Sequence, residues 1–367
     1  MRRCSRRSLL AGLSAGSLAG AAGCVAEPLT TGTNGETIQD QAGREVTLPE
    51  TVDRVVGVGP GALRLVCHLG LASRVVAVEY PEHADDDWTP PYTLAHPEFR
   101  ELRTAGPQHG GDAESIVEAA PDLIVAATET PERASQLQSR TGVPTLWVDQ
   151  GDFADGRDSL YAAWHTVGKA VDRLERAEEL VEFVTSTREE LRRMTTDAGA
   201  DPSVFAGAVS HRGGQGVTST EVPFPPFSML GVRSVAGELA PNGNGEGGGT
   251  VKRTVSAERL LEWDPDTLFV NRANLPIVEE ELPGSGLDEL SAFRDGSVFG
   301  VHPQYYYEYN PSTMLANAYY VGSVVYPDAF DGVDPTAAAD RVYRAFYGTE
   351  LYDRLSDAFG PYGRIDL

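Results

Sequence analysis

The stretch DRLERAEELVEFVTSTREELRRMTTD, residues 172–197, predicts one long and uninterrupted α-helix near the middle of the chain. Asp172 and Glu175 have the spacing of a capping box at its start, and Gly199 with Pro202 would end it. Short β-branched runs and helical segments alternate on both sides, so we expect the helix to be a rigid strut between two lobes. Its apolar side chains recur at helical spacing, at Leu174, Ala177, Leu180, Val181, Val184, Leu191 and Met194.

The composition restricts the class of partner. The chain has 367 residues, enough for two cores of ordinary size, and it carries a formal charge of −24 with an isoelectric point near 4.6. A nucleic-acid-binding surface must be basic, so this charge argues against nucleic acid as a partner. The acidic residues are spread along the chain, which favours a strongly solvated surface of the halophilic kind over a specific acidic face.

The N-terminus predicts the compartment. Residues 5–10, SRRSLL, are typical of a twin-arginine export signal, and the apolar run behind them is too short to span a bilayer. The run ends at residues 21–24, AAGC, which resembles the lipobox of lipoproteins. We therefore expect a signal over 1–23, lipid on Cys24 and a tether over 24–39. The protein would then be anchored to the extracytoplasmic face of the cell membrane.

Residues 40–171 predict an N-terminal α/β lobe. Strand and helix alternate throughout, and such alternation produces a parallel sheet with helices on its faces. In these sheets, ligands bind beyond the carboxyl ends of the strands. The candidate ligand-binding residues on this rim are Pro60, Gly61, Glu79, Tyr80, Thr128, Glu129 and Thr130.

One motif in this lobe suggests a different function. Gly57-x-Gly59-x-x-Ala62 follows a predicted strand and opens a helix, and Glu79 ends the next strand, as in a weak dinucleotide fingerprint. An exported nicotinamide-dependent oxidoreductase is therefore the alternative function. A tight turn that needs small residues is the preferred interpretation, because Pro60 lacks the amide N–H that a phosphate would bind.

Residues 198–367 predict a second α/β lobe with its own polar rim. Arginines beside a glycine-rich turn favour an anionic ligand, whereas phenols stack on flat ligands and coordinate ferric iron when ionised. Solvated loops and aromatic packing are the competing interpretations. The candidates on this rim are His211, Arg212, Gln215, Arg272, Tyr305, Tyr306, Tyr307 and Tyr309.

No dedicated catalytic or metal motif is found in the sequence. The seven histidines are scattered, and none forms the close pair of a first-row metal site. The sequence also has no P-loop, and its Gly-x-Ser-x-Gly match at residues 12–16 falls inside the predicted export signal and not at a strand-to-helix elbow. We therefore expect neither enzymatic activity nor a resident cofactor or metal.

Several ordered motifs resemble a known family. The segments 43–49, 52–56 and 69–71 resemble the start of the substrate-binding lipoproteins of iron-complex and cobalamin importers, a single-backbone-helix family of periplasmic binding proteins. Residues 114–125 and 261–270 each predict a helix, then a Pro-Asp pair, then a strand. They resemble a step that this family has once in each lobe. Further motifs are similar to a branch called iron-complex binding proteins: Pro91-Tyr92 with His96–Glu98, Gly213–Gly216 with Ser219-Thr220, and Asn317–Gly322 with Tyr326-Pro327.

The resemblance implies a fold and a mode of action. It implies two Rossmann-like lobes with parallel sheets, joined by one long helix, that close slightly on an iron complex such as a siderophore, haem or similar chelate. Some relatives bind oxyanions. It implies a monomer that docks on an ABC permease, with its ATPase, through acidic side chains: Glu98, Glu101 and Glu238 by position. Tyr92 and Ser219 of the matching motifs join the expected ligand-binding residues.

Overall fold

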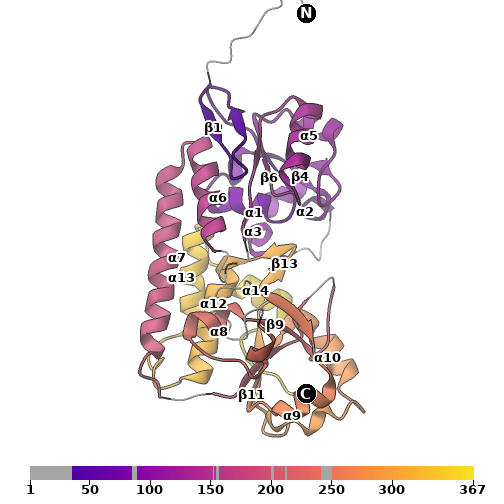
Figure 1. Cartoon of the computed structure of the whole chain (residues 1–367), viewed down its shortest axis with the longest axis vertical. Coiled ribbons are helices and arrows are strands. Elements are labelled where there is room, and N and C mark those ends of the chain that lie inside the picture. The colour runs from indigo at the N-terminus through magenta and orange to yellow at the C-terminus, as the bar shows by residue number, and fades with distance from the viewer. Residues whose placement is uncertain are drawn as a thin grey trace, which may run out of the picture. The chain divides into compact units, whose positions relative to one another are not determined.

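A five-stranded parallel sheet is the centre of the N-terminal lobe in the computed structural model (Figure 1). Its strand order is β5-β4-β3-β6-β7, and its central strands are buried on both faces because helices cover them. The strands are β3 (Val55–Val58), β4 (Val75–Glu79), β5 (Arg103–Gly106), β6 (Leu123–Ala126) and β7 (Thr145–Trp147). The structure describes residues 35–84, 89–151, 153, 157–199, 202–210, 213–240 and 250–367.

Short helices and one hairpin surround this sheet. The hairpin pairs β1 (Thr37–Gln39) with β2 (Glu45–Thr47). The helices are α1 (Ala62–His68), α2 (Tyr80–Ala84), α3 (Pro91–Ala95), α4 (Ala113–Ala119), α5 (Pro131–Thr141) and α6 (Arg157–Ala170), with 3-10 turns η1 (Ala72–Arg74) and η2 (Pro97–Glu101).

The C-terminal lobe has a second, smaller sheet. Strands β8 (Val204–Gly207), β11 (Thr267–Asn271) and β12 (Val298–Val301) are parallel, and β15 (Gly363–Arg364) joins β12 in antiparallel orientation. Two ribbons lie outside this sheet: β9 (Ser219–Val222) with β10 (Val251–Thr254), and β13 (Tyr305–Tyr306) with β14 (Glu308–Tyr309). In Figure 1, β13 lies between the two lobes. This arrangement confirms the expected α/β class with a parallel sheet in each lobe.

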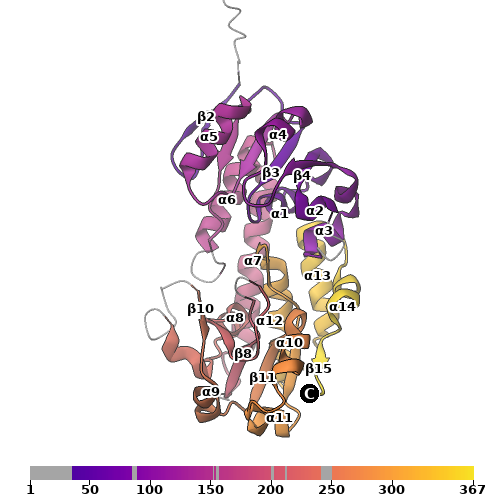
Figure 2. The ribbon, with the colours of Figure 1, turned by 90° about the vertical axis from the view of Figure 1, so that its right-hand side faces the viewer.

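The helices of the second half complete this lobe and return toward the first. They are α8 (Pro225–Leu230), α9 (Ala257–Trp263), α10 (Leu275–Glu281), α11 (Ser291–Arg294), α12 (Pro311–Val325), α13 (Pro335–Tyr347) and α14 (Tyr352–Phe359), with the turns η3 (Val235–Leu239), η4 (Arg272–Asn274) and η5 (Leu287–Glu289). Figure 2 shows α13 and α14 between the two sheets, on the far side from the β10 ribbon.

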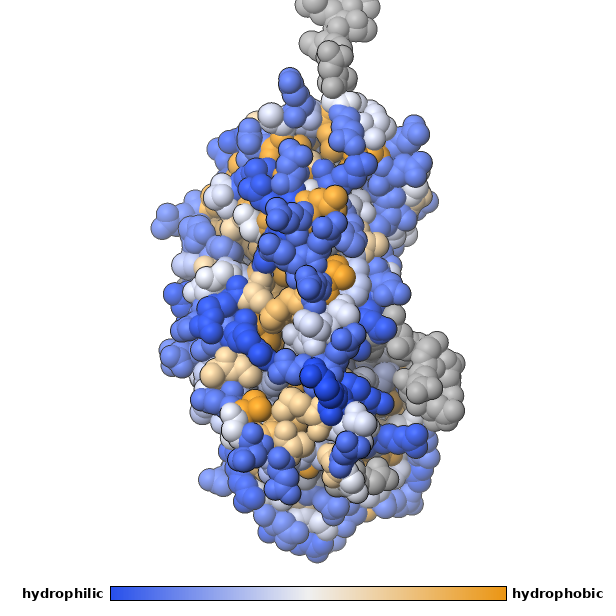
Figure 3. Space-filling view, turned by 90° about the vertical axis from the view of Figure 1, so that its left-hand side faces the viewer, coloured by the Kyte–Doolittle hydropathy of each residue, from blue (hydrophilic) through white to orange (hydrophobic). Residues whose placement is uncertain are grey.

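The long helix forms as α7 (Leu174–Thr195), a single 22-residue element between the lobes. The expected capping box is absent, because Asp172 adopts φ +56° and the N-cap is Arg173, which makes no side-chain cap bond. Leu174 is 42% exposed and not part of the buried face. The buried face consists of Ala177, Leu180, Val184, Thr187 and Leu191. The surface around α7 is largely hydrophilic (Figure 3).

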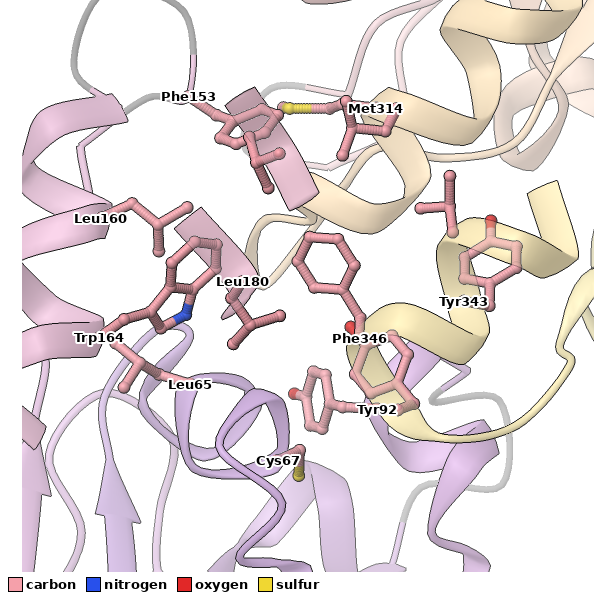
Figure 4. Close-up of a cluster of buried hydrophobic side chains, with 14 of the residues drawn as sticks. Leu65, Cys67, Tyr92, Phe153, Leu160, Trp164, Leu180, Met314, Tyr343 and Phe346 are labelled. Atoms are coloured by element: carbon pink, nitrogen blue, oxygen red, sulfur yellow. The ribbon is translucent and has the colours of Figure 1, made fainter. Parts of the chain in front are cut away.

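One apolar core continues through both lobes. It includes Leu65 of α1, Trp164 of α6, Leu180 of α7, Met314 of α12 and Phe346 of α13, whose side chains converge in Figure 4. Helix α13 packs against α1, α3, α7 and α12, so α7 is not the only connection between the lobes. Two separate clusters, one per sheet, fill the outer face of each lobe.

The N-terminal expectations lie outside the described residues. These are the signal over 1–23, the lipid on Cys24 and most of the tether over 24–39. The lobe boundaries at residues 40, 172 and 198 stay predictions. Across the described part of the chain, no helix combines the length and the apolar character needed to cross a membrane.

Candidate functional site

A cavity of about 290 Å³ lies at the carboxyl ends of the N-terminal strands. Residues that follow β3, β5, β6 and β7 form most of its wall, and Glu308 of β14 closes it from the C-terminal half of the chain. This is the edge at which ligands bind open parallel sheets. The lining residues are Pro60, His109, Ala127, Thr128, Glu129, Trp147, Val148, Asp149, Gln150, Gly151 and Glu308.

Carboxylates dominate the charge of this interlobe cavity. Glu129, Asp149 and Glu308 line it, and no lysine or arginine is among the described lining residues, although Glu129 is largely exposed and pairs with Arg133 at 3.4 Å. Burial raises the pKa of Glu308, although Arg64 and Lys252 partly oppose this shift. The cavity therefore favours neutral or cationic groups over bare anions.

A buried arginine supports the floor of the cavity. Arg64 is 1% exposed, and its Nη2 donates to Gln150 Oε1 at 2.5 Å, while Gln150 Nε2 donates to the Pro60 carbonyl at 3.1 Å. Burial lowers the pKa of Arg64, and nearby Glu308 raises it. Gln150 is thus held in a fixed orientation at the cavity wall.

The glycine motif serves packing, as the preferred interpretation expected. A Cβ at Gly57 would lie 2.6 Å from the Leu63 backbone nitrogen. Gly59 has φ +90°, and a Cβ there would lie 2.5 Å from the Ala127 carbonyl oxygen. A Cβ at Gly61 would meet the side chains of Arg64 and Gln150, which fill the space over this turn.

A hydrogen-bonded latch joins the lobes beside the cavity. The Tyr307 hydroxyl donates to Glu79 Oε2 at 2.5 Å and accepts from the His109 amide at 2.9 Å. The Gly110 amide donates to Glu79 Oε1 at 3.0 Å. Burial raises the pKa of Glu79, and these donors lower it in part. Tyr307 adopts φ +66°, so the latch fixes a left-handed backbone between β13 and β14.

A second, small pocket lies at the carboxyl ends of β8, β11 and β12. It is lined by Ser210, Asn271, His302, Gln304 and Tyr305 together with apolar residues of the sheet. The Nδ2 atoms of Asn271 and Asn274 donate to Ser210 Oγ at 3.2 and 3.0 Å. The second lobe thus presents neutral polar groups at the carboxyl-end edge of its sheet, and the interlobe cavity lies at the equivalent edge of the first lobe.

Lys252 of β10 covers the tyrosines of the hairpin. Its Nζ lies 3.0 Å from the Tyr305 ring centroid and 5.1 Å from that of Tyr309. Burial lowers the pKa of Lys252, whereas Glu221 and Glu308 raise it. Burial raises the pKa of Tyr305, as do Glu308 and Glu221, so the phenolate that could coordinate ferric iron is disfavoured.

The structure brings part of the expected ligand-binding set together. Pro60, Thr128 and Glu129 line the interlobe cavity. Glu79 and Tyr307 form the latch beside it. Gly61 lies beneath Gln150, and Tyr305 lines the small pocket.

Other expected residues lie elsewhere. Tyr92 is 1% exposed, and its hydroxyl donates to Glu82 Oε1 at 3.0 Å within the core. Ser219 is buried and donates to the Val209 carbonyl at 2.8 Å. Neither pocket is lined by Tyr80, Thr130, Gln215, Arg272, Tyr306 or Tyr309. His211 and Arg212 are outside the described residues.

The position of Arg272 shows that a residue at a strand end need not line a ligand pocket. A Cβ at Gly300 would lie 2.3 Å from Arg272 Nε, and one at Gly360 would lie 2.7 Å from its Nη1. The side chain therefore lies over the backbone of β12 and of the segment before β15. Burial lowers its pKa there, and it does not line the interlobe cavity.

Sequence reasoning missed several residues of both pockets. Trp147 ends β7 and Asp149 and Gln150 follow it, and the strand-end rule that selected Thr128 would also have found them. His302 and Gln304 follow β12 in the same way. Only the fold shows that these residues share an edge with those after β6 and β11.

The three expected docking residues are exposed. Glu98 and Glu101 lie on η2, where Glu98 Oε1 is 3.2 Å from His96 Nδ1, and Glu238 on η3 pairs with Arg259. Within the described ranges, no three His, Cys, Asp or Glu side chains are grouped so that they could hold a metal ion.

Comparisons with known proteins agree with this architecture. The family model described as periplasmic binding protein matches residues 55–305. The molybdate-binding protein MolA of Haemophilus influenzae is 22% identical over 340 residues, covering 85% of this chain and 91% of MolA. Its molybdate-bound structure has a TM-score of 0.67 at 20% identity, with 86% and 98% of the two chains covered.

Two further solved structures have the same fold. A periplasmic solute binding protein of Veillonella parvula has a TM-score of 0.67 at 16% identity, covering 88% of this chain and 96% of its own. The petrobactin-binding protein YclQ of Bacillus subtilis has a TM-score of 0.56 at 16% identity, covering 80% and 98%. These relatives are binding proteins, which overturns the oxidoreductase alternative. The chain belongs to the periplasmic binding protein family, the substrate-binding proteins of ABC importers, and is not an enzyme.

Proposed function

We propose that this protein captures a small metal chelate, such as an iron complex, in the interlobe cavity and delivers it to the permease of an ABC importer. The observation that carries the proposal is the lining of that cavity by Glu129, Asp149 and Glu308. Three carboxylates around one cavity repel a bare oxyanion, whereas a chelate can present neutral or cationic groups to them.

The size and chemistry of the cavity support a chelate. Its volume, about 290 Å³, is near the lower end of the range for small-molecule sites. Trp147 adds a flat apolar surface, and its Nε1 donates to the Thr128 carbonyl at 3.0 Å, which fixes the ring. Burial raises the pKa of Tyr305 in the neighbouring small pocket, which fits a cargo whose iron is already held by its chelator.

An oxyanion is the second candidate. The similarity to a molybdate-binding protein favours it, and two buried cations, Arg64 and Lys252, lie near Glu308. Both cations are already engaged, by Gln150 and by the hairpin tyrosines, and neither lines the interlobe cavity, whereas the carboxylates do.

Calorimetric titration of the full chain with ferric desferrioxamine B, haem and molybdate separates the candidates. We expect one of the chelates to bind and molybdate to give no heat of binding. Glu308→Gln should weaken the binding of a cationic chelate, while Glu118→Gln, at a solvent-exposed site, should leave it unchanged. Saturable binding of molybdate with no binding of either chelate would refute the proposal.

We also propose where in the cell the protein acts. Membership of the family implies an extracytoplasmic location. We further propose twin-arginine export and a lipid anchor on Cys24, with Glu98, Glu101 and Glu238 contacting the permease. Replacing Cys24 with Ser should release the protein from membranes, as fractionation and immunoblotting would detect.

A further inference from the structure

The small pocket in the C-terminal lobe contains two buried acceptor atoms that no described residue satisfies. They are His302 Nδ1 and Gln304 Oε1. Both side chains line the pocket, and the residues are 0% and 6% exposed. Leaving a buried acceptor without a donor is energetically unfavourable, so two in one small pocket indicate that a donor group belongs there.

The hydrogen bonds of His302 determine its tautomer. Its Nε2 lies 3.1 Å from the Gly360 carbonyl oxygen, which can only accept, so Nε2 carries the proton. Burial lowers the pKa of His302 to about 4, which keeps the ring neutral. Nδ1 is therefore a bare lone pair, able to accept a hydrogen bond and unable to donate one.

The surroundings hold this ring in place. Asn317 Oδ1 accepts from the His302 amide at 3.3 Å, and Asn317 Nδ2 donates to the His302 carbonyl at 2.9 Å. The Tyr362 ring lies 4.6 Å from the imidazole centroid at an angle of 30°. Tyr362 also donates to Asn317 Oδ1 at 3.0 Å. The imidazole is thus pre-organised, as a ligand-contacting group should be.

The carboxylate of Glu221 determines the orientation of Gln304. Its amide Nε2 lies 2.9 Å from Glu221 Oε2, an acceptor, so the amide nitrogen must face Glu221. Gln304 Oε1 is then the atom left for the pocket. Both groups consequently present acceptors, and neither can rotate to present a donor without losing its present bond.

We propose that this pocket is the C-terminal half of the binding site and takes an N–H or O–H donor of the cargo, bound by His302 Nδ1 and Gln304 Oε1. The proposal rests on the proposed function and narrows the cargo to chelates whose organic part carries a hydrogen-bond donor. A fully deprotonated oxyanion has no such donor. The pocket, about 10 Å³, admits only one terminal group.

Two isosteric ferric chelates test this inference. Maltol and the corresponding hydroxypyridinone differ at one ring position, where oxygen is replaced by N–H. In calorimetric titrations of the full chain, we expect the N–H chelate to bind roughly tenfold tighter or more. Equal affinities would overturn the inference while leaving the proposed function intact, so the two failures are distinguishable.

Two variants test whether the small pocket causes the difference in affinity between the two chelates. Gln304→Leu removes one acceptor and should reduce the preference for N–H, whereas Gln136→Leu, on the exposed side of α5, should preserve it. A preference that survives Gln304→Leu at full size would place the donor elsewhere and overturn the assignment.

A measurement on the wild-type protein tests the inference when the variant or the small chelates cannot be used. If Gln304→Leu fails to fold, or neither small chelate binds, nitrogen NMR of isotope-labelled histidine follows His302 directly as gallium desferrioxamine B, the diamagnetic equivalent of the ferric chelate, is added. A shift of the Nδ1 signal with Nε2 unchanged supports the inference. An unmoved Nδ1 signal at saturation overturns it, as would binding of molybdate in place of every chelate.

Discussion

At the scale of single residues, burial controls the protonation of two neighbouring carboxyl groups. Glu79 and Glu82 are 2% and 3% exposed. Burial, together with the charge of Glu79, raises the pKa of Glu82 to about 8, and the hydrogen bond from Tyr92 lowers it in part. Glu82 is therefore largely protonated in the folded protein near neutral pH.

Glu82→Gln should change the pH dependence of stability. The folded pKa lies above the ordinary value of 4.5, so the native state holds a proton that the unfolded state releases between about pH 4.5 and about 8. The contribution of Glu82 to the free energy of unfolding consequently falls as pH rises through this window. The glutamine variant should lack this contribution, as urea denaturation across the window would show.

The comparison with the variant separates Glu82 from the histidines. Burial lowers the pKa of His68 and His302, so their contribution to stability is lost as pH falls below about 6.5, in the opposite sense. Both proteins contain these histidines, so the histidine contributions cancel when the free energy of unfolding of the variant is subtracted from that of the wild type. Parallel pH profiles for the two proteins would show that Glu82 is ionised in the native state.

Tyr307→Phe should weaken the latch between the lobes. The change removes the donor to Glu79 and the acceptor for the His109 amide, which should cost about 1–3 kcal/mol and raise the pKa of Glu79 further. Tyr80→Phe, at a side chain that is 59% exposed, serves as the control and should cost little. Denaturation midpoints that match in both variants would mean that the latch is not a stabilising contact.

At the residue scale, the sequence is most informative where backbone geometry decides the outcome. The Gly57–Ala62 turn was interpreted correctly because a missing amide at Pro60 and a need for small residues are visible in the sequence. Tyr92 and Arg272 were misplaced relative to the cavity, because a strand-end position does not say whether a side chain enters the core or the edge. That choice depends on partners far away in the chain.

At the scale of elements, α7 was predictable and α13 was not. The periodicity of α7 is local, whereas the position of α13 depends on packing against α1 and α12. Phe346 of α13 is 1% exposed and packs on His68 and Trp164 of the first lobe. The lobes therefore share a core in addition to the strut, which restricts their relative movement.

Phe346→Ala should loosen both lobes at once. Truncating a buried phenylalanine costs about 3–5 kcal/mol, and here the cavity would open at the shared core. Hydrogen exchange should rise in α1 as well as in α13. Phe205→Ala, at a buried residue of β8 in the separate cluster of the second lobe, should raise exchange in its own lobe only. Equal exchange patterns in the two variants would show that α13 does not couple the lobes.

At the scale of the whole molecule, the formal charge is −24, and the acidic residues are spread along the chain. Self-repulsion destabilises so acidic a folded chain, and salt screens it. We expect the thermal midpoint to rise when sodium chloride is raised from about 0.1 M to 1 M. A midpoint that falls or stays constant would argue against the halophilic interpretation of the composition.

The central claim is that a metal chelate occupies the cavity between the lobes. The most direct measurement is anomalous diffraction at the iron edge from crystals of the full chain grown with ferric desferrioxamine B. The proposed function predicts one iron peak, enclosed by Thr128, Gln150 and Glu308. An iron peak outside this cavity, or a crystal that binds molybdate there and no iron, would contradict it.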